Sequence, residues 1–372
     1  MLLNHIKRVI TNIPGWRTNR KIVVIESDDW GSVRIPSKSI YSKLLKAGIP
    51  VDKDPYCKFD SLETAEDIYS IFDILSKYKD KNGTHPVITV NTVMSNPDFK
   101  KIKDSKFQKY YYLPSLNPNG SSSHDTIKLF NEGISNHLFF PQFHGREHLN
   151  TKQWLLALQN GDNETHIAFE YGVYGIPLKN KVLGRRNDFM AALDINSYDD
   201  VPYLSDSIKE GSILFEKRFN YRSKSFVAPC YTWSSELEIK LREAGIFYIQ
   251  GIHFQNEPIP GKCEYKRRLH YIGQKNRHGQ IYLIRNCSFE PTITQNTGIV
   301  DECLKRINLL FKLGKPVIIG THRLNYTGTL HVENRINNLM ILDKLLKQIL
   351  KLWPDTEFMN TCQLGELIKN KS

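Results

Sequence analysis

Apolar runs rich in β-branched or aromatic residues recur along the whole chain, and helical patterns lie between them. We expect strands near residues 21–27, 86–92, 138–143, 225–229, 246–252, 281–286, 316–321 and 356–360. Periodic apolar positions predict helices at Ser61–Lys77, Thr151–Gln159, Leu204–Phe219, Ser234–Ala244, Val300–Leu313 and Val332–Leu352. Strands that alternate with helices form a mainly parallel sheet. Eight or so such units with no clear break predict an α/β fold, a closed or nearly closed barrel of strand–helix units.

Two regions do not follow this alternation. Residues 95–124 are polar, basic and aromatic, and residues 160–202 contain several Gly, Asn and Asp residues. Both are longer than an ordinary connection, so we expect them to be excursions over one face of the barrel, where active-site lids are found. The expected organisation is a basic segment over residues 1–20 and a single barrel domain over residues 21–372.

The chain has 372 residues, 40% of them hydrophobic, and a formal net charge of +12. Such a surface favours anionic partners, but the basic residues are scattered and no nucleic-acid-binding signature is present, so we expect no nucleic-acid partner. No run approaches the ~18 consecutive apolar residues of a membrane-spanning helix. The N-terminal residues lack the apolar core of a secretory signal. These features predict a cytoplasmic protein. Its basic N-terminal segment could touch a membrane surface peripherally, but such a segment more often packs beside the first strand.

An acidic pair, Asp28 and Asp29, directly follows the apolar run Lys21–Ile25. In a β/α barrel, the residues just after a strand lie on the catalytic face. Two adjacent carboxylates oppose each other's ionisation, and a bound cation removes that repulsion. The alternative is an N-cap for the next element. A cap needs only one of the two residues, so the pair favours a functional site.

A histidine pair, His144 and His148, follows the apolar run 138–143. A single histidine in this position is more often structural, but two of them four residues apart can converge on one ion. Two histidines and one aspartate form a three-ligand set for a catalytic divalent metal, with a coordination position left for water. The second aspartate is then free to act as a base. Zinc is the first expectation, and cobalt, manganese and nickel are the alternatives.

Two further strand ends carry candidate residues. His322 ends the run 317–322 and is well placed for proton transfer, unless it is a partly buried histidine bonded to the backbone. The turn at Cys230 and Tyr231 follows the run 225–229 and could aim backbone N–H groups into a site, unless these side chains pack in the core. No motif supports Cys230 as a nucleophile.

Taken in order, these motifs resemble the polysaccharide deacetylase superfamily, the NodB-homology or carbohydrate esterase type. The matching segments are Glu26–Asp29, His144 with His148, Ala228–Tyr231, and Ile318–His322. The strand and helix after residue 356 also look like the end of that family. The resemblance spans residues 26 to 322 with the order preserved, and it implies a distorted (β/α)7–8 barrel that holds a divalent metal.

The resemblance also implies roles for single residues. Asp28 would be the general base and Asp29 a metal ligand, with His144 and His148 as the other ligands. His322 would be the general acid. The implied activity is removal of an N- or O-linked acetyl group from a sugar or polysaccharide precursor. The implied partner is an acetylated sugar, and the basic surface extends this expectation to nucleotide- or lipid-linked sugars that carry phosphate.

Four residues are expected at the substrate or the oxyanion: Cys230 and Tyr231 in the turn, and Trp30 and Arg146 beside the acidic and histidine pairs. The chain also departs from the family pattern. The arginine that braces the base in the third motif has no counterpart before Pro229, and we expect Arg146 or Arg323 to substitute for it. Glu26 stands where a small hydroxyl residue is usual, and Gly145 replaces the usual Ser or Thr.

Other functions remain open at this level. The residues from His144 to His148 also fit the H-x-x-E-H pattern of inverted zincins, with Glu147 as base, which would make the chain a metallopeptidase. That pattern needs a helix, and it leaves Asp28 and Asp29 without a role. A non-catalytic barrel that binds an acidic glycan or a membrane surface is the third possibility, supported by the altered third motif. A glycosidase would need two carboxylates that flank the bond.

Overall fold

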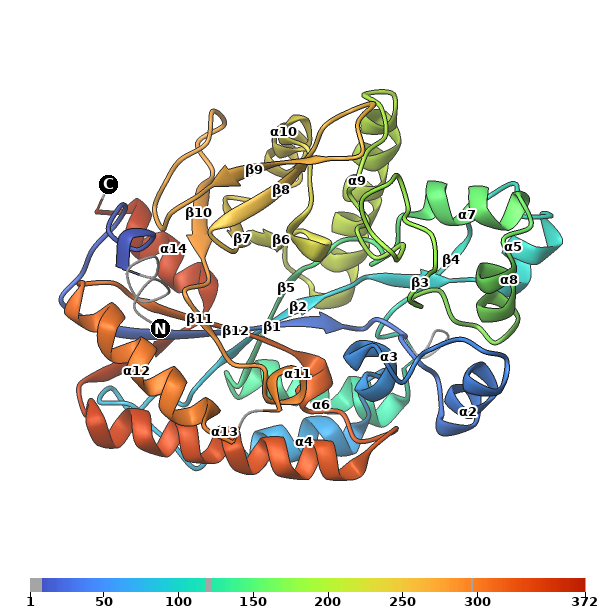
Figure 1. Ribbon diagram of the computed structural model, residues 1–372. Helices are drawn as coiled ribbons and strands as arrows, with labels where there is room; N and C mark the ends of the chain where they lie inside the picture. The colour runs from blue at the N-terminus through green and yellow to red at the C-terminus, as the bar shows by residue number, and fades with distance from the viewer. Residues whose placement is uncertain (1–8, 118–121, 296, 372) are drawn as a thin grey trace.

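The core of the protein is one parallel sheet of nine strands (Figure 1). The computed structural model describes residues 9–117, 122–295 and 297–371. The strands are β1 (Lys21–Trp30), β2 (Ile88–Thr92), β5 (Phe139–Phe143), β6 (Ser225–Val227), β7 (Tyr248–Gly251), β10 (Ile281–Ile284), β11 (Cys287–Ser288), β12 (Val317–His322) and β13 (Thr356–Met359). Their order is β10-β7-β6-β5-β2-β1-β12-β11, and β13 also pairs with β1. Every predicted strand is therefore present, and the predicted α/β class with a mainly parallel sheet is confirmed.

The two ends of this sheet are joined by the chain itself. β10 and β11 end the strand order on opposite sides, but only Arg285 and Asn286 separate them in sequence. The Arg285 N–H donates to the carbonyl of Gly251 in β7 at 2.8 Å, and the Asn286 N–H donates to that of Ile318 in β12 at 3.2 Å. The sheet is thus curled into a nearly closed form. Among the described residues no strand pairing joins β10 to β11.

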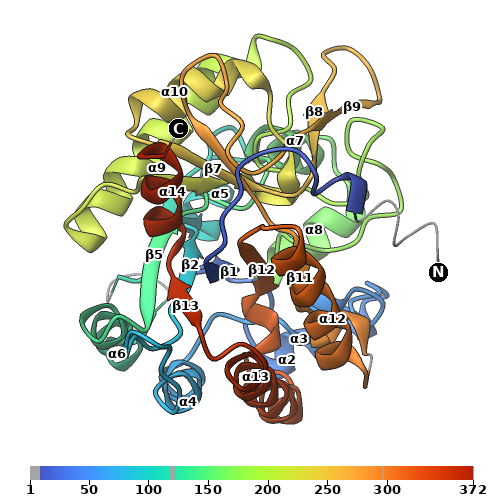
Figure 2. The same cartoon turned by 90° about the vertical axis from the view of Figure 1, so that its left-hand side faces the viewer.

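Helices surround the curled sheet (Figure 2). They are α2 (Lys38–Lys46), α3 (Pro55–Phe59), α4 (Ala65–Leu75), α5 (Phe99–Asp104), α6 (His124–Ser135), α7 (Thr151–Gln159), α8 (Asn163–Glu170), α9 (Asp200–Phe219), α10 (Glu238–Glu243), α11 (Pro291–Thr294), α12 (Ile299–Lys312), α13 (Val332–Leu352) and α14 (Thr361–Lys369). All six predicted helices are present; the one expected at Ser234–Ala244 is a short 3₁₀ turn followed by α10. The strand β1 is buried from Ile22 onward because helices or neighbouring strands cover both of its faces.

The two long excursions contain more structure than their sequence suggests. Residues 95–124 form β3 (Ser95–Pro97), α5, β4 (Tyr112–Pro114) and the start of α6. Residues 160–202 contain α8, a long irregular segment and the start of α9. A separate hairpin pairs β8 (Phe254–Pro258) with β9 (Tyr265–Leu269). In Figure 1, α2, α3, α5, α7 and α8 gather at the end toward which β1 points.

The described part of the chain contains no helix that is both long enough and apolar enough to cross a bilayer. Of the basic segment 1–20, residues 1–8 lie outside the described residues. The cytoplasmic location and the membrane contact stay predictions.

An ion cluster at the start of β1 gives a stability test. Arg20 donates two hydrogen bonds to Glu357 of β13, at 2.9 and 2.5 Å, and Lys81 lies 3.1 Å from the same carboxylate. These cations lower the pKa of Glu357 to about 2. The stabilisation is present above the ordinary carboxyl pKa and is lost as the pH falls through 2. We expect Glu357→Gln to lower the free energy of unfolding by about 1–3 kcal/mol at pH 7.

Denaturant unfolding of both proteins at pH 7, 4 and 2.5 measures this effect. The difference between wild type and variant should shrink from pH 4.5 downward. A difference that is independent of pH would show that the ionised carboxylate is not what stabilises this edge.

Candidate metal centre and active site

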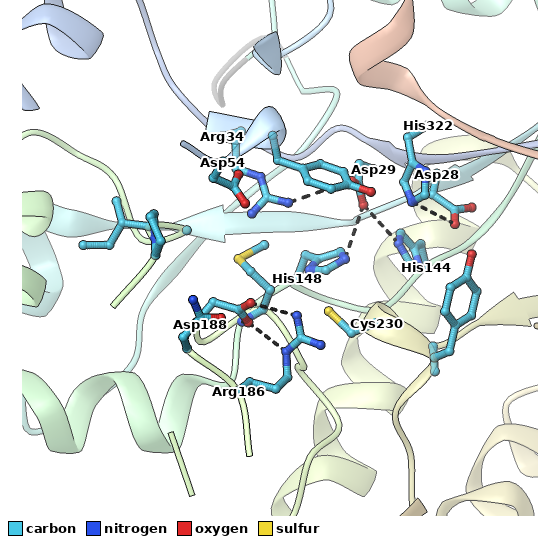
Figure 3. A pocket seen from close by; sticks show the side chains of 18 of the residues that line it. Asp28, Asp29, Arg34, Asp54, His144, His148, Arg186, Asp188, Cys230 and His322 are labelled. Atoms are coloured by element: carbon cyan, nitrogen blue, oxygen red, sulfur yellow. Dashed lines mark hydrogen bonds and ion pairs between the residues drawn. The ribbon is translucent and has the colours of Figure 1, made fainter. Parts of the chain in front are cut away.

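The acidic pair lies at an irregular end of β1. The pairing of β1 with β2 shifts register between Ser27 and Trp30, and Asp29 has a left-handed backbone with φ of 73°. Neighbouring side chains of a regular strand point to opposite faces, so this irregularity is what lets both carboxylates reach one space. Asp28 and Asp29 both line a cavity of about 410 Å³ at the carboxyl end of the strands (Figure 3).

The histidine pair converges on Asp29. His144 and His148 follow β5 in irregular chain before α7, and their ring centroids are 5.1 Å apart. The Nε2 atoms of both rings lie 3.3 Å from the same oxygen, Oδ1 of Asp29. One ligand atom from each of the three residues lies within 4.8 Å of the others, and all three residues are buried. The structure thus brings together the ligand set predicted from sequence.

The polar atoms of this group fit a cation. The Nδ1 of His144 lies 2.8 Å from the Val227 carbonyl, which can only accept, so Nδ1 donates there and Nε2 is the nitrogen that faces Asp29. Burial lowers the pKa of His148 to about 3, so this ring is neutral at pH 7, and its Nδ1 has no hydrogen-bond partner in the described chain. Two imidazole nitrogens and a carboxylate oxygen are the donors of a catalytic zinc site. The group could therefore bind a divalent metal.

Arg285, in the link between β10 and β11, holds Asp28. Its Nη1 donates to Oδ2 at 2.6 Å and its Nη2 to Oδ1 at 2.7 Å, and Asn91 donates to Oδ1 at 2.8 Å. Burial alone would raise the pKa of Asp28, but the guanidinium lowers it to about 2. Asp28 is therefore ionised at neutral pH. Its Oδ2 also faces Nε2 of His322 across 3.8 Å.

The same guanidinium has three other partners. Its Nε donates to Glu26 at 2.7 Å, Nη1 lies 3.0 Å from the Tyr231 hydroxyl, and Nη2 donates to the Gln250 side chain at 3.3 Å. Gly320 of β12 provides the space, because a Cβ there would lie 2.7 Å from Cδ of Arg285. The sequence analysis missed Arg285. Its position directly after the apolar strand 281–284 could have identified it as a candidate site residue.

The two arginines expected to brace the base are engaged elsewhere, which corrects that expectation. Arg146 pairs with Glu147 at 2.5 Å and with Glu210 at 2.6 Å. Arg323 pairs with Asp60 and Glu63 and is fully buried. Neither lines the cavity that holds Asp28.

Trp30 also lies away from the cavity. Its ring is fully buried, donates to Ser27 Oγ at 3.0 Å, and packs edge-on against Phe130 and Phe139. The carboxyl end of β1 turns its carboxylates toward the cavity and this ring into the core. Trp30 and Arg146 therefore do not contact the space where a substrate would sit, contrary to what the sequence suggested.

His322 is held by a carboxylate that the sequence analysis did not identify. Its Nδ1 lies 2.6 Å from Oε1 of Glu290, whose other oxygen accepts from the Asn325 side chain at 2.7 Å. Burial opposes protonation, but Glu290 and the nearby aspartates outweigh it and raise the pKa of His322 to about 9. His322 therefore carries a proton at neutral pH, and its Nε2 is directed at the side of the cavity where Asp28 lies.

Cys230 and Tyr231 line the cavity from a turn in which both have positive φ, 56° and 53°. The Tyr231 N–H donates to the Ala228 carbonyl at 2.9 Å, so it is not free for an oxyanion. Burial raises the pKa of the Cys230 thiol to about 12, which agrees with the view that this residue is no nucleophile.

Glu147 does not have the position of a metallopeptidase base. Its carboxylate is buried, pairs with Arg146 and accepts from Ser207 at 3.1 Å. It does not line the cavity, and the segment that contains it is not helical. These features disfavour the H-x-x-E-H interpretation.

Much of the remaining cavity wall comes from segments between the strands of the sheet. Arg34, Asp54 and Tyr56 come from the segment after β1, and Arg186 and Asp188 from the excursion 160–202. The excursion therefore contributes to the wall of the cavity, as expected of a lid segment. Sequence reasoning singled out none of these five residues, because neither a motif nor a strand end marks them.

Comparison with known proteins adds little beyond general similarity. No family model matches the chain, and no curated protein matches it. Similar solved structures include a proposed polysaccharide deacetylase from Mycobacterium smegmatis, with a TM-score of 0.44, 9% identity, and coverage of 96% of this chain and 93% of that one. The peptidoglycan deacetylase PdaC from Bacillus subtilis has a TM-score of 0.37, 12% identity, and coverage of 95% and 93%.

A third is the 4-α-glucanotransferase from Thermococcus litoralis, with a TM-score of 0.44 and 9% identity. That alignment covers 93% of this chain, which spans only 40% of the glucanotransferase. At these TM-scores the similarities carry no activity over to this chain.

Metal content tests the ligand set directly. We expect about one zinc, cobalt, manganese or nickel ion per chain after purification without chelators, because two imidazoles and a carboxylate leave room for one such ion. The double variant His144→Ala/His148→Ala should lose it, whereas His166→Ala, a histidine on α8 outside the cavity, should keep it. Elemental analysis of the three proteins provides the measurement. A wild type without metal, even after reconstitution, would contradict the site.

Proposed function

We propose that this protein is a metal-dependent hydrolase that removes an N- or O-linked acetyl group from a sugar. One observation carries the proposal: a candidate metal-binding group, a braced carboxylate and a protonated histidine line a single cavity. The motif order that resembles polysaccharide deacetylases supports the same assignment. The metal would be held by Asp29, His144 and His148, with zinc as the first candidate.

A divalent metal at this site supplies Lewis acidity, which polarises a carbonyl group and lowers the pKa of water. The chain provides the groups that move protons. Asp28 is ionised, and its Oδ2 is directed toward the cavity, so it can accept the proton of the attacking water. Arg285 holds the carboxylate in that orientation through two parallel hydrogen bonds.

His322 is protonated, which is the state that a general acid needs. Its Nδ1 is occupied by Glu290, and its Nε2 carries the proton that a leaving amine or alkoxide needs. Arg285 lowers the pKa of Asp28 to about 2. Glu290 raises the pKa of His322 to about 9. Such a pair of environments defines a base and an acid that are both ready at neutral pH.

The turn at Cys230 and Tyr231 is the candidate contact for the oxyanion. Since the Tyr231 N–H is engaged within its turn, we assign the Cys230 N–H as the backbone group nearest to a developing oxyanion. A cavity of about 410 Å³ lies within the size range of small-molecule sites. The formal net charge of +12 supports substrates that carry phosphate, such as nucleotide- or lipid-linked sugars. A non-catalytic glycan-binding barrel would have the same fold but would not release acetate.

Acetate release from acetylated nucleotide-linked, lipid-linked and free sugars tests the function. We expect Asp28→Asn to lower kcat/KM by ~10²–10⁴-fold, because the variant cannot accept a proton. Glu147→Gln should retain most of the activity of the folded protein, since Glu147 does not line the cavity. Activity that survives in Asp28→Asn but is lost in Glu147→Gln would favour a metallopeptidase. A metal-loaded wild type that releases no acetate would favour the non-catalytic binding barrel.

The partnership of Glu290 with His322 predicts a change in pH dependence. The raised pKa keeps His322 protonated up to about pH 9, so activity should persist to that pH and fall above it. In Glu290→Gln the histidine loses its proton at lower pH, so the alkaline limb of kcat/KM should move downward while the rate near pH 6 changes little. The exposed Glu333→Gln is the control. An unchanged alkaline limb would exclude His322 as the acid.

A further inference from the structure

Arg34 is a buried cation that faces the cavity without a close partner. It is 6% exposed and lines the cavity beside the metal-binding group. Its Nη2 lies 3.9 Å from Oδ2 of Asp29, and its Nε lies 4.0 Å from Oδ2 of Asp60; the Nε has no hydrogen-bond partner in the described chain. The Tyr56 ring covers the guanidinium at 5.1 Å. A guanidinium offers five N–H donors, and leaving a buried one such as this Nε–H unbonded costs free energy.

The carboxylates around Arg34 are committed to other partners. Asp60 accepts three hydrogen bonds from Arg323, at 2.9 to 3.1 Å. Asp54 accepts from the Cys57 N–H at 2.8 Å and caps α3. Asp29 belongs to the metal-binding group, and a cation held there would take over the charge that now faces Arg34. The carboxylates around Arg34 thus hydrogen-bond to other groups, and the two nearest lie 3.9 and 4.0 Å from its guanidinium.

A second arginine lines the same cavity. Arg186 is held in place by Asp188 through two hydrogen bonds, at 2.9 and 2.7 Å. Figure 3 shows Arg34 and Arg186 on opposite sides of His148. Arg186 is therefore held by a carboxylate at hydrogen-bond distance, whereas the carboxylate oxygens beside Arg34 lie 3.9 and 4.0 Å away.

We propose that Arg34 binds an anionic group of the acetylated sugar, a carboxylate or a phosphate, beside the acetyl group that is removed. This inference rests on the proposed function and names the substrate class. A guanidinium presents paired N–H donors whose spacing matches the oxygens of both groups, and in a desolvated site such a pair discriminates strongly against a neutral analogue. The distance from Arg34 to Asp29 places this subsite next to the metal-binding group.

Equilibrium binding to the zinc-loaded protein tests the subsite. The probes are N-acetylglucosamine, which is neutral, N-acetylglucosaminuronic acid, which carries a carboxylate, and N-acetylglucosamine 6-phosphate. We expect at least one anionic probe to bind the wild type at least ~10-fold more tightly than the neutral probe. In Arg34→Gln this ratio should fall to near one while zinc content stays unchanged. Arg277→Gln, an exposed arginine that pairs with Glu236, should keep the wild-type ratio.

Arg34→Lys provides a second variant if Arg34→Gln does not fold. It keeps the charge but loses the paired donors, so it should retain only part of the selectivity. Equal affinity of the wild type for all three probes would overturn the proposal, as would selectivity that survives in a folded Arg34 variant. The tighter of the two anionic probes identifies the group as carboxylate or phosphate.

Acetate release is measured on the same samples. Release from the probes without selectivity for an anion would reject this inference and keep the deacetylase function. Selective binding that depends on Arg34 without any acetate release would reject the deacetylase function and keep an anionic sugar subsite.

Discussion

The interaction on which the site depends is the pairing of one guanidinium with two buried carboxylates of β1. Glu26 and Asp28 lie on the same face of the strand, and both are almost fully buried. Two carboxylates in this environment would be strongly destabilising without a cation. Arg285 donates to both at 2.6 to 2.7 Å, and Thr361 of α14 donates to Glu26 at 2.7 Å. This network connects the first strand with the β10–β11 link and with the last helix.

The pairing also separates the two neighbouring aspartates chemically. Asp28 is compensated by Arg285, whereas Asp29, turned away by its left-handed backbone, faces the two histidines. Adjacent carboxylates that are ionised together need different counter-ions. In the proposed site the counter-ions would be a fixed side chain for Asp28 and an exchangeable metal ion for Asp29. The proposed base and the proposed metal ligand would then occupy successive positions of a single strand.

The predictable part of the molecule is the part that elementary patterns determine. Strands were visible as apolar runs, and His144 and His322 could be placed because parallel strands deliver their last residues to one face. Glu290 lies on the same face, two residues after the short strand β11. No apolar run in the sequence predicts that strand. Arg34 and Arg186 reach the cavity on irregular segments whose course depends on tertiary packing, and no local pattern encodes such a course.

The position of the brace shows the limit of reasoning from motif order. The family's arginine before Pro229 is absent and Arg146 or Arg323 was expected to replace it, yet the guanidinium that holds Asp28 comes from the link between β10 and β11. In such a sheet the carboxyl ends of the strands face the same cavity. The charge of Asp28 therefore requires a cation that is close in space, and this cation can follow any of the strands in sequence. This contact also requires Gly320, because only a residue without Cβ lets Arg285 cross β12 to reach β1. The brace therefore combines an arginine that follows β10 with a glycine in β12.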